Sequence, residues 1–541
     1  MAKRYRPVDR DQPFLFPPDM REWLPPDHPV WLVITVVGDH LDTSAFHARR
    51  RTGGAGTAGY DPDMLLTVLV WAYLHGVTSS REMERLCGTD VAFRVICAGN
   101  LPDHVTFARF RGDFRGAVAA FFTEVLILCA RLGMARLGVV ALDGMKIAAS
   151  ASKAANRTEE GLRKLAEQAV AAHAAADAAE DELFGAGRRG DEVPAGAWSP
   201  RRRDERIAAA LAGLEAERKA AQAAEEAKAE AFRERQRAGR RTGPAPRQAA
   251  VELAGENLQR VRAARAAQLE QLERRYAAGE PRRARAAGVD DYCRVRQAAA
   301  RVEKARARAA EAERKAAEKA AAAADPGPVR NITDPDSRLM PVRGGGFIQG
   351  YNTENMTSED KLVIATELTD DPADMAWFAP MLARAEDAAA LIAAHRPSGP
   401  APGPGGGQDR IELALADSGY CSEANLTCPG PDRLIAVAKR RDLEKAARGQ
   451  DSAGTGRGGA AVQAMRERLK TPDGIAAYRQ RGHIAETPHG HIKHNMGIRQ
   501  LSLRGKAKAA AEWAFICALH NLHKAITTGH LTPQALATLA S

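Results

Sequence analysis

The sequence predicts an α/β protein with an all-α, helix-turn-helix-like domain at its N-terminus and a long Ala-rich helical insertion. Three observations predict this class. Short apolar runs alternate with helical patterns from residue 137 onward, which is typical of a mixed sheet flanked by helices. Residues 1–135 show short helical patterns joined by tight turns. Residues 156–329 consist mostly of strong helix formers with few large apolar side chains.

Composition sets the outer limits on domain number and partners. The chain has 541 residues, with 78 Lys and Arg against 68 Asp and Glu, so its net charge is +10. This length predicts two to four domains, and the charge favours a polyanion partner without requiring one. Hydrophobic residues make up 45% of the chain, which excludes a wholly disordered protein. Residues 151–330 contain 37 basic and 29 acidic residues, so most of the excess charge lies in one segment.

Neither a membrane segment nor an oxidising compartment is indicated. The longest apolar runs, such as 30–37, are too short to span a bilayer, and the basic N-terminus has no apolar stretch directly behind it. The seven cysteines are scattered and odd in number, which favours inert thiols in a reducing compartment. We therefore expect a cytoplasmic protein without a membrane partner.

The helical pattern of residues 1–135 begins clearly at Pro62, a residue that favours the first turn of a helix. Large apolar residues follow at three-to-four spacing, and Gly76 is expected to end this helix. Ser79 with Glu82 then forms a capping-box pattern that predicts the start of a second helix.

A third helix is predicted to begin near Thr106, and it carries the basic residues Arg109 and Arg111. Short helices with a basic last member resemble a helix-turn-helix unit, in which the second helix contacts DNA. A generic helical bundle whose arginines are merely solvated is an equal alternative.

The Ala-rich segment predicts long helices over 201–238, 248–278 and 292–324, separated by breaks that contain Gly and Pro. Ile207, Leu211 and Leu214 begin a heptad-like stripe, after which alanine replaces the large residues. We expect a helical hairpin or an Ala-rich coiled coil, and an array of solvated, frayed helices is the alternative.

Strands are predicted where apolar or β-branched residues form short runs: 137–142, 347–352, 361–368, 411–417 and 433–438. An amphipathic helix is expected over 376–394, and further helices are expected at the C-terminus. A Pro/Gly stretch, 397–407, is expected to be flexible, and a second Gly-rich stretch, 449–459, leads to the C-terminal helices.

Two aspartates follow predicted strands directly. Asp143 comes after the first strand in an Asp-Gly pair that is expected to form a turn, and Asp417 ends the strand at 411–417. Ligands of α/β sheets bind outside the carboxyl ends of the strands, so these acids would meet there if their strands were parallel neighbours. Taken singly each acid is weak evidence, because Asp before a turn is common.

Glu486, within 478–493, is the best candidate for a third acid. Three carboxylates can hold two Mg²⁺ ions about 3.5–4 Å apart, which stabilises the attacking and the leaving oxygen of an in-line displacement at a phosphodiester. Glu486 and Lys493 are seven residues apart and are expected on one face of a helix. Because Pro488 is tolerated only in a first helical turn, we expect that helix to begin at Glu486.

In combination these motifs resemble the DDE-type insertion-sequence transposases, in the group whose third acid lies within a Tyr-Arg-Glu-Lys signature. The matching stretches, in chain order, are 102–111, 142–152, 334–340, 350–352, 416–420, 478–493 and 512–522. The resemblance covers nearly the whole chain apart from about 156–329, and several short motifs in the same order are more specific than any single one.

The resemblance implies an RNase H-like catalytic domain and a transposase that cuts DNA at the ends of an insertion sequence and joins the 3′-hydroxyl to target DNA. It implies that Asp143, Asp417 and Glu486 are catalytic acids that bind Mg²⁺, for which Mn²⁺ can substitute. The partners would be double-stranded DNA, as terminal inverted repeats and target, and further copies of the chain in a synaptic complex. The enzyme would be bacterial and nucleoid-associated.

The resemblance also implies supporting residues and domain limits. Tyr478, Arg481 and Lys493 match the signature residues that position the DNA backbone or support the acids. The expected domains, in chain order, are 1–135 helical and DNA-binding, 136–155 first catalytic strand, 156–329 helical insertion, 330–530 remainder of the catalytic domain, and 531–541 tail.

Basic residues and histidines near the C-terminus are less specific. Arg499 and Arg504, with two nearby lysines, are expected to form a DNA-backbone surface, and a solvated helix face is nearly as good an interpretation. Seven of the fourteen histidines fall from His483 onward, at irregular spacing and with no cysteine close by. Contact with phosphate or packing beside the acids is therefore favoured over a zinc site.

Two other classes of function stay open on the sequence. One is a non-catalytic DNA-binding protein derived from a decayed or repurposed transposase. The other is a coiled-coil assembly protein in which the Ala-rich segment carries the function.

Overall fold

The computed structural model describes residues 19–48, 59–113, 115–168, 171, 199–238, 245–246, 249–278, 280–281, 286–322, 329–342, 345–397, 409–437 and 458–540. The stretch expected to be flexible, 397–407, and the second Gly-rich stretch, 449–459, lie almost wholly outside these residues. The chain forms two units, one of Met1–Ala155 with Asp336–Ser541 and the other of Asn156–Pro335. In the part described, no helix is both long and apolar enough to cross a membrane.

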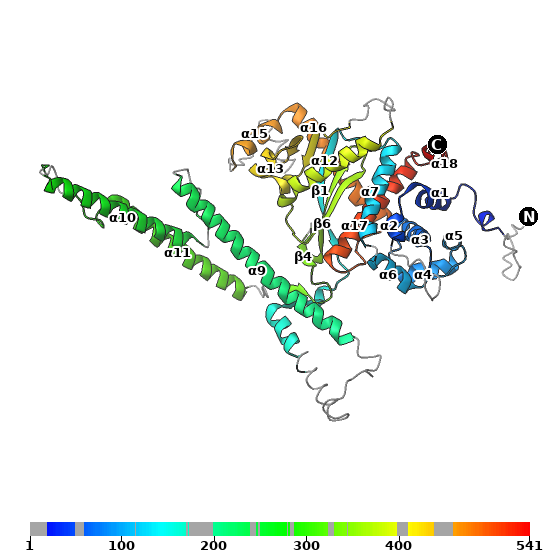
Figure 1. Ribbon diagram of the computed structural model, residues 1–541, viewed down its shortest axis with the longest axis horizontal. Coiled ribbons are helices and arrows are strands. Elements are labelled where there is room, and N and C mark those ends of the chain that lie inside the picture. Colours follow the sequence, from blue (N-terminus) through cyan, green and yellow to red (C-terminus); the bar gives the residue numbers. More distant parts are fainter. Residues whose placement is uncertain are drawn as a thin grey trace, which may run out of the picture. The chain divides into compact units, whose positions relative to one another are not determined.

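The first unit contains a six-stranded mixed sheet (Figure 1). Its strands are β1 (Val139–Ala148), β4 (Arg338–Pro341), β5 (Phe347–Ser358), β6 (Val363–Thr369), β7 (Leu413–Ala416) and β8 (Asp432–Ile435). The order is β4-β5-β1-β7-β8, with β6 also paired to β5. β5 is antiparallel to β1, β4 and β6, whereas β7 runs parallel to β1 and β8 runs parallel to β7. The broad prediction of an α/β layout is confirmed.

The first strand differs from its prediction in length. β1 continues through Asp143 and Gly144 to Ala148, so the turn expected at this Asp-Gly pair is wrong. The reason is the long antiparallel partner β5, which pairs Asp143 with Asn355 and Gly144 with Glu354. The parallel partner β7 pairs with β1 only as far as Ala141. Asp143 therefore lies within a strand but beyond its parallel pairing.

Helices cover the sheet and complete its core (Figure 1). α12 (Phe378–His395), α16 (Pro472–Gly490) and α17 (Lys506–Thr527) pack on the sheet, and α7 (Arg115–Arg131) packs on α17 and α12. Smaller helices that follow β7 in the chain are α13 (Glu423–Thr427), α15 (Ala460–Arg468) and α18 (Pro533–Ala540). Trp513 of α17 is fully buried in the core.

The N-terminal helices share this core. They are α1 (Pro29–Thr35), α2 (Ser44–His47), α3 (Pro62–Leu74), α4 (Ser80–Thr89), α5 (Val91–Ile96) and α6 (His104–Asp113). α3 begins at Pro62 as predicted, capped by the Asp61 carboxylate, and it packs against α17. The capping box expected at Ser79 does not form, because the Ser79 side chain makes no capping hydrogen bond.

The second unit contains the three long helices that the Ala-rich segment predicts, α9 (Ser199–Arg237), α10 (Ala250–Ala277) and α11 (Cys293–Ala322). α10 and α11 pack against each other, and a two-stranded sheet pairs β2 (Asn156–Thr158) with β3 (Val329–Asn331). The apolar stripe of α9 packs against Leu162 and Ile332 near this small sheet. The stripe thus anchors α9 within its unit and is not a coiled-coil seam.

Both junctions with the second unit lie beside one residue of β5. The Ala149 N–H donates to the Gln349 carbonyl at 2.9 Å, and the Gln349 amide donates to Ser337 Oγ at 2.7 Å. These hydrogen bonds hold both junctions within the first unit.

We predict that replacing residues 156–335 by a short Gly/Ser linker leaves the first unit folded, with a cooperative thermal transition and an intact near-UV circular dichroism spectrum. Loss of both signals would contradict the prediction and would favour a central role of the helical segment in the fold.

Candidate active site

Asp143 and Asp417 stand at the same place on two parallel strands. The last residues that β1 and β7 pair in register are Ala141 and Leu415, and each aspartate comes two residues later. Asp417 then turns the chain, because its Oδ1 accepts the Gly419 N–H at 2.8 Å and caps a short 3₁₀ turn. Parallel register therefore brings together two acids that are 274 residues apart in sequence.

Arg481 of α16 contacts both aspartates. Its Nη2 lies 2.7 Å from Asp143 Oδ1 and 3.7 Å from Asp417 Oδ2. The Arg481 side chain is only 12% exposed, because α16 packs on β1 and β5. A single guanidinium thus offsets the repulsion between two carboxylates that the sheet forces close together.

His489 faces the other oxygen of Asp143, with Nδ1 3.5 Å from Oδ2. Its tautomer follows from Asn355, whose Oδ1 accepts from Thr366 Oγ1 at 2.6 Å and from Trp513 Nε1 at 3.2 Å. The Asn355 amide nitrogen is therefore a donor, and it lies 3.1 Å from His489 Nε2. In neutral His489 the proton then resides on Nδ1 and points toward Asp143.

These contacts shift the pKa values of the two aspartates in opposite directions. Burial alone would raise the pKa of Asp143, but the hydrogen bond and charge of His489 and the charge of Arg481 outweigh it and lower that pKa. Burial raises the pKa of Asp417, against the opposing effect of Arg481 and with a further contribution from Asp143. Asp143 is the more firmly ionised acid of the pair.

A second pair of acids, which the sequence analysis missed, lies beside the first. A Cβ atom at Gly144 would lie 3.2 Å from Asp374 Oδ1 and 3.3 Å from Glu354 Oε1, so a side chain here would crowd both carboxyl groups. Lys146 pairs with Asp374 at 3.0 Å. The Asn352 amide donates to Glu354 Oε1 and to Asp374 Oδ1, each at 2.8 Å.

The surroundings of Glu354 favour its protonated form. It is fully buried on β5, and the Tyr420 hydroxyl donates to its Oε2. Burial raises the pKa of Glu354 to about 8, aided by the charge of Asp374 and opposed by the Tyr420 hydrogen bond. The signal that could have revealed this residue is the run of polar side chains in a long strand, 349–358, which the antiparallel pairing buries on both faces.

Glu486 does not form a group of closely spaced ligand atoms with the two aspartates among the described residues. It is exposed on α16, and it is five residues from Arg481, so the two side chains leave the helix about 140° apart. The expectation that the helix begins at Glu486 is wrong, because α16 runs from Pro472 to Gly490 and includes Pro488. The preceding turns start the helix, and the backbone N–H that Pro488 lacks is lost only one turn before the helix ends.

The other signature residues are partly buried. Lys493 lies in a π-helical turn, His491–Asn495, that directly follows α16, so it does not share one regular helix with Glu486. Its Nζ lies 3.4 Å from the Lys146 carbonyl, and burial together with Arg499 lowers its pKa. Tyr478 packs at the margin of a small apolar cluster around Ala141.

The arginines expected to contact DNA fall into two groups. Arg109, Arg499 and Arg504 are exposed. Arg111 is buried, and its Nη1 donates to Tyr73 OH, to the Thr78 carbonyl and to Ser502 Oγ at 2.9–3.0 Å. These contacts favour a structural role for Arg111 over the phosphate contact that we expected.

Three histidines form a hydrogen-bonded chain between α17 and the π-helical turn. His520 Nε2 must donate to the Lys361 carbonyl at 2.9 Å, so its Nδ1 accepts from His491 Nδ1 at 3.0 Å, and His491 Nε2 accepts from His523 Nδ1 at 3.1 Å. Burial lowers the pKa of His491 to about 4 and that of His520 to about 3. The arrangement supports packing as their role.

In the part of the chain that the structure describes, one group of three potential metal ligands has closely spaced atoms: His47, Asp61 and Asp63. Asp61 caps α3, and His47 pairs with Asp63 at 3.1 Å, which accounts for their closeness. Asp143 and Asp417 do not form such a group with a third ligand among the described residues.

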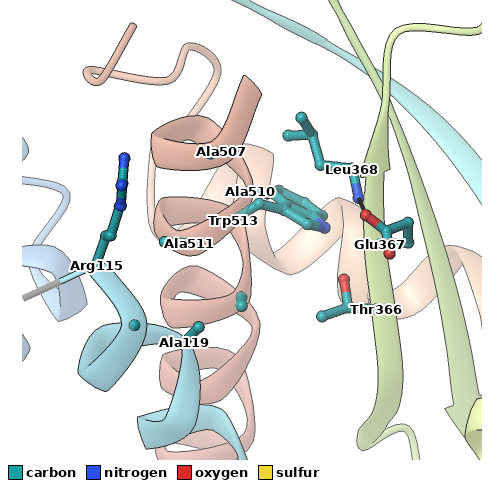
Figure 2. A pocket seen from close by; sticks show the side chains of 11 residues that line it. Arg115, Ala119, Thr366, Glu367, Leu368, Ala507, Ala510, Ala511 and Trp513 are labelled. Atoms are coloured by element: carbon teal, nitrogen blue, oxygen red, sulfur yellow. Dashed lines mark hydrogen bonds between the residues drawn. The ribbon is translucent and has the colours of Figure 1, made fainter. Parts of the chain in front are cut away.

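A pocket between α7, β6 and α17 is unrelated to the acids (Figure 2). Arg115, Thr366, Glu367 and Trp513 line it together with alanines of α7 and α17. None of the predicted site residues contributes to its walls, so the acids of β1 and β7 remain the better candidate for a functional site.

Two protein families match the chain. Residues 18–113 match a family described as Transposase domain (DUF772), and residues 456–526 match one described as Transposase DDE domain. The chain is related to the DDE-type insertion-sequence transposases. The predicted resemblance is thereby confirmed, although the matched residues make up less than a third of the chain. No curated protein and no solved structure matches this transposase-related chain.

Arg111 and Arg109 offer a matched pair of substitutions on one helix. We predict that Arg111→Ala lowers the free energy of unfolding by about 2–4 kcal/mol, because it removes several buried hydrogen bonds of a charged donor. Arg109→Ala, an exposed site, should change it by less than about 0.5 kcal/mol. Urea denaturation followed by tryptophan fluorescence measures both values, and equal small effects would contradict the structural role of Arg111.

Glu354 generates a prediction on pH dependence. A carboxyl whose folded-state pKa is raised to about 8 adds stability at low pH that is lost as the pH rises through that value. The free energy of unfolding of the metal-free wild type should therefore fall, relative to Glu354→Gln, by up to about 1.4 kcal/mol per pH unit between pH 5 and 8. The exposed Glu412→Gln is the control. Parallel stability profiles for all three proteins would refute the assignment.

Proposed function

We propose that the chain is an active DNA transposase that cuts phosphodiesters at the ends of an insertion sequence and joins the resulting 3′-hydroxyl to target DNA. The observation that carries the proposal is the convergence of Asp143 and Asp417 at one point of the sheet. It is supported by the match of residues 456–526 to a transposase DDE domain, a range that includes Glu486.

We further propose that the sheet is an RNase H-like core. Its support is the central place of β1, with antiparallel strands on one side and two parallel strands on the other. In this arrangement one acid lies within the central strand and another at the end of its parallel neighbour.

The side chains at the site suit divalent cations of the Mg²⁺ or Mn²⁺ type. Carboxylate oxygens are the ligands these hard ions prefer, and Asp143 and Asp417 already lie close enough to share one cationic group, the Arg481 guanidinium. Asp143, Asp417 and Glu486 would hold the ions, with Asp374 within reach of the same cluster. Bound there, the ions would supply charge stabilisation for the attacking and leaving oxygens.

The chain's own residues would prepare this chemistry. His489 and Arg481 keep Asp143 ionised, and the hydrogen bond from Asn355 fixes the His489 ring so that its proton faces Asp143. Burial raises the pKa of Glu354, so its protonated form would add no further negative charge beside Asp374. The exposed Arg499 and Arg504 are suited to neutralise DNA phosphates, as is Arg109 on α6.

The partners that follow from the proposal are the terminal inverted repeats, the target DNA and further copies of the chain. A DNA-binding protein that no longer cuts is the second candidate. It is favoured by the exposed position of Glu486, which leaves the acid cluster one ligand short among the described residues.

Isosteric substitution of the acids tests the proposal. We predict that Asp143→Asn, Asp417→Asn and Glu486→Gln each reduce Mg²⁺- or Mn²⁺-dependent cleavage of a duplex bearing the repeats that flank the gene. The loss should exceed about 100-fold, which corresponds to about 2.7 kcal/mol of transition-state stabilisation. DNA binding should stay close to wild type, because the substitutions remove no positive charge.

Glu412→Gln, an exposed substitution next to β7, controls for general effects of losing an acid. Cleavage at the wild-type rate by any of the three acid variants would remove that residue from the site. A wild-type protein that binds the repeats but cuts in neither Mg²⁺ nor Mn²⁺ would favour the non-catalytic alternative.

A further inference from the structure

We infer that Arg481 is a positioning residue that takes the place of a divalent cation between Asp143 and Asp417 and releases the two acids when it pairs with a DNA phosphate. DNA binding and divalent-cation binding would then reinforce each other. The inference rests on the proposed function, and it adds a coupling that the acids alone do not require.

The Arg481 guanidinium contacts both aspartates through one nitrogen atom. One nitrogen, Nη2, serves both carboxylates, at 2.7 Å from Asp143 and 3.7 Å from Asp417. The guanidinium therefore sits at the shared side of the two acids, which is where a bridging cation would bind. Arg481 keeps its charge at any physiological pH, so it excludes a divalent cation from that place as long as it stays there.

Glu486 lies on the same helix as Arg481 but points in a different direction. Arg481 and Glu486 leave α16 about 140° apart, although Glu486 is close enough to Arg481 for its charge to raise the Arg481 pKa. In the structure Arg481 faces the aspartates and Glu486 is exposed to solvent. Arg481 thus pairs with both aspartates, whereas Glu486 forms no close ligand group with them among the described residues.

Arg481 also has a hydrogen-bond donor that the described residues do not use. Its Nε is buried and has no hydrogen-bond partner among the atoms of the described residues. A guanidinium has five N–H groups in a fork that matches the oxygens of a phosphate. A phosphate that reaches Arg481 would satisfy the donors that the two aspartates leave unused, which favours the exchange.

Linkage fixes the sign of the coupling. If DNA draws Arg481 from the acids, it raises their affinity for a divalent cation, and the cation must raise the affinity for DNA by the same factor. The protein would then assemble its ions chiefly on bound DNA, and free protein would hold them weakly.

The test measures Mn²⁺ binding by electron paramagnetic resonance on the full chain without DNA. Arg481→Gln should bind Mn²⁺ more tightly than wild type, by about 5- to 150-fold, the usual range of coupling between sites. Arg479→Gln removes an exposed charge from the same helix and should bind Mn²⁺ as wild type does. Arg481→Lys keeps the charge and should stay closer to wild type than Arg481→Gln.

The same titration is repeated with an excess of a 30-base-pair duplex at low salt. The gain in Mn²⁺ affinity that DNA produces should be smaller in Arg481→Gln than in wild type. The inference would be overturned if Arg481→Gln bound Mn²⁺ no more tightly than wild type without DNA, or if DNA raised the Mn²⁺ affinity of both proteins equally. Arg481 would then have a purely structural role.

Asp143→Asn distinguishes a failure of the proposed function from a failure of the proposed coupling through Arg481. If wild type has a Mn²⁺ site that Asp143→Asn removes, the proposed metal site stands and the Arg481 variants decide the coupling. If wild type shows no such site with or without DNA, the proposed function itself fails, whatever the Arg481 variants do.

Discussion

The salt bridges of Arg481 with Asp143 and Asp417 are the interaction on which the candidate site depends. Parallel pairing of β1 and β7 carries two carboxylates to one point of the sheet, and their mutual repulsion would oppose that pairing. α16 supplies the opposing charge, and the same helix carries the third predicted acid. The packing of this helix therefore controls both the stability of the acid pair and its availability to other cations.

A second layer of polar contacts supports the first. Asn355, paired opposite Asp143 on β5, is fixed by Thr366 and Trp513 and in turn orients His489 toward Asp143. Burying such groups costs free energy unless their hydrogen bonds are satisfied, and nearly every atom in this set has a partner. This polar layer links α17 through β5 to the acids, so the packing of α17 bears directly on the site.

Much of the fold and part of the site could be predicted from sequence. The apolar runs marked every strand that carries a predicted acid, and the Ala-rich composition marked the long helices. The sequence did not show that β1 continues past Asp143, because strand length here depends on the distant β5. It did not reveal Glu354, because the polar run at 349–358 identifies a buried strand only once its partner strands are known, nor Asp374, which lies in the connection after β6. The place of Pro488 inside α16 was mispredicted because a proline near a helix end costs less than the general rule suggests.

We propose that Asp143, Asp417 and Glu486 bind divalent cations together on DNA. A crystal structure of the protein with duplex terminal repeats and Mn²⁺, with anomalous diffraction to locate the ions, would show this binding directly. We expect Mn²⁺ between Asp143 and Asp417, Glu486 among the ligands, and Arg481 on a phosphate. Ions elsewhere, or Arg481 still bridging the two aspartates beside bound DNA, would contradict it.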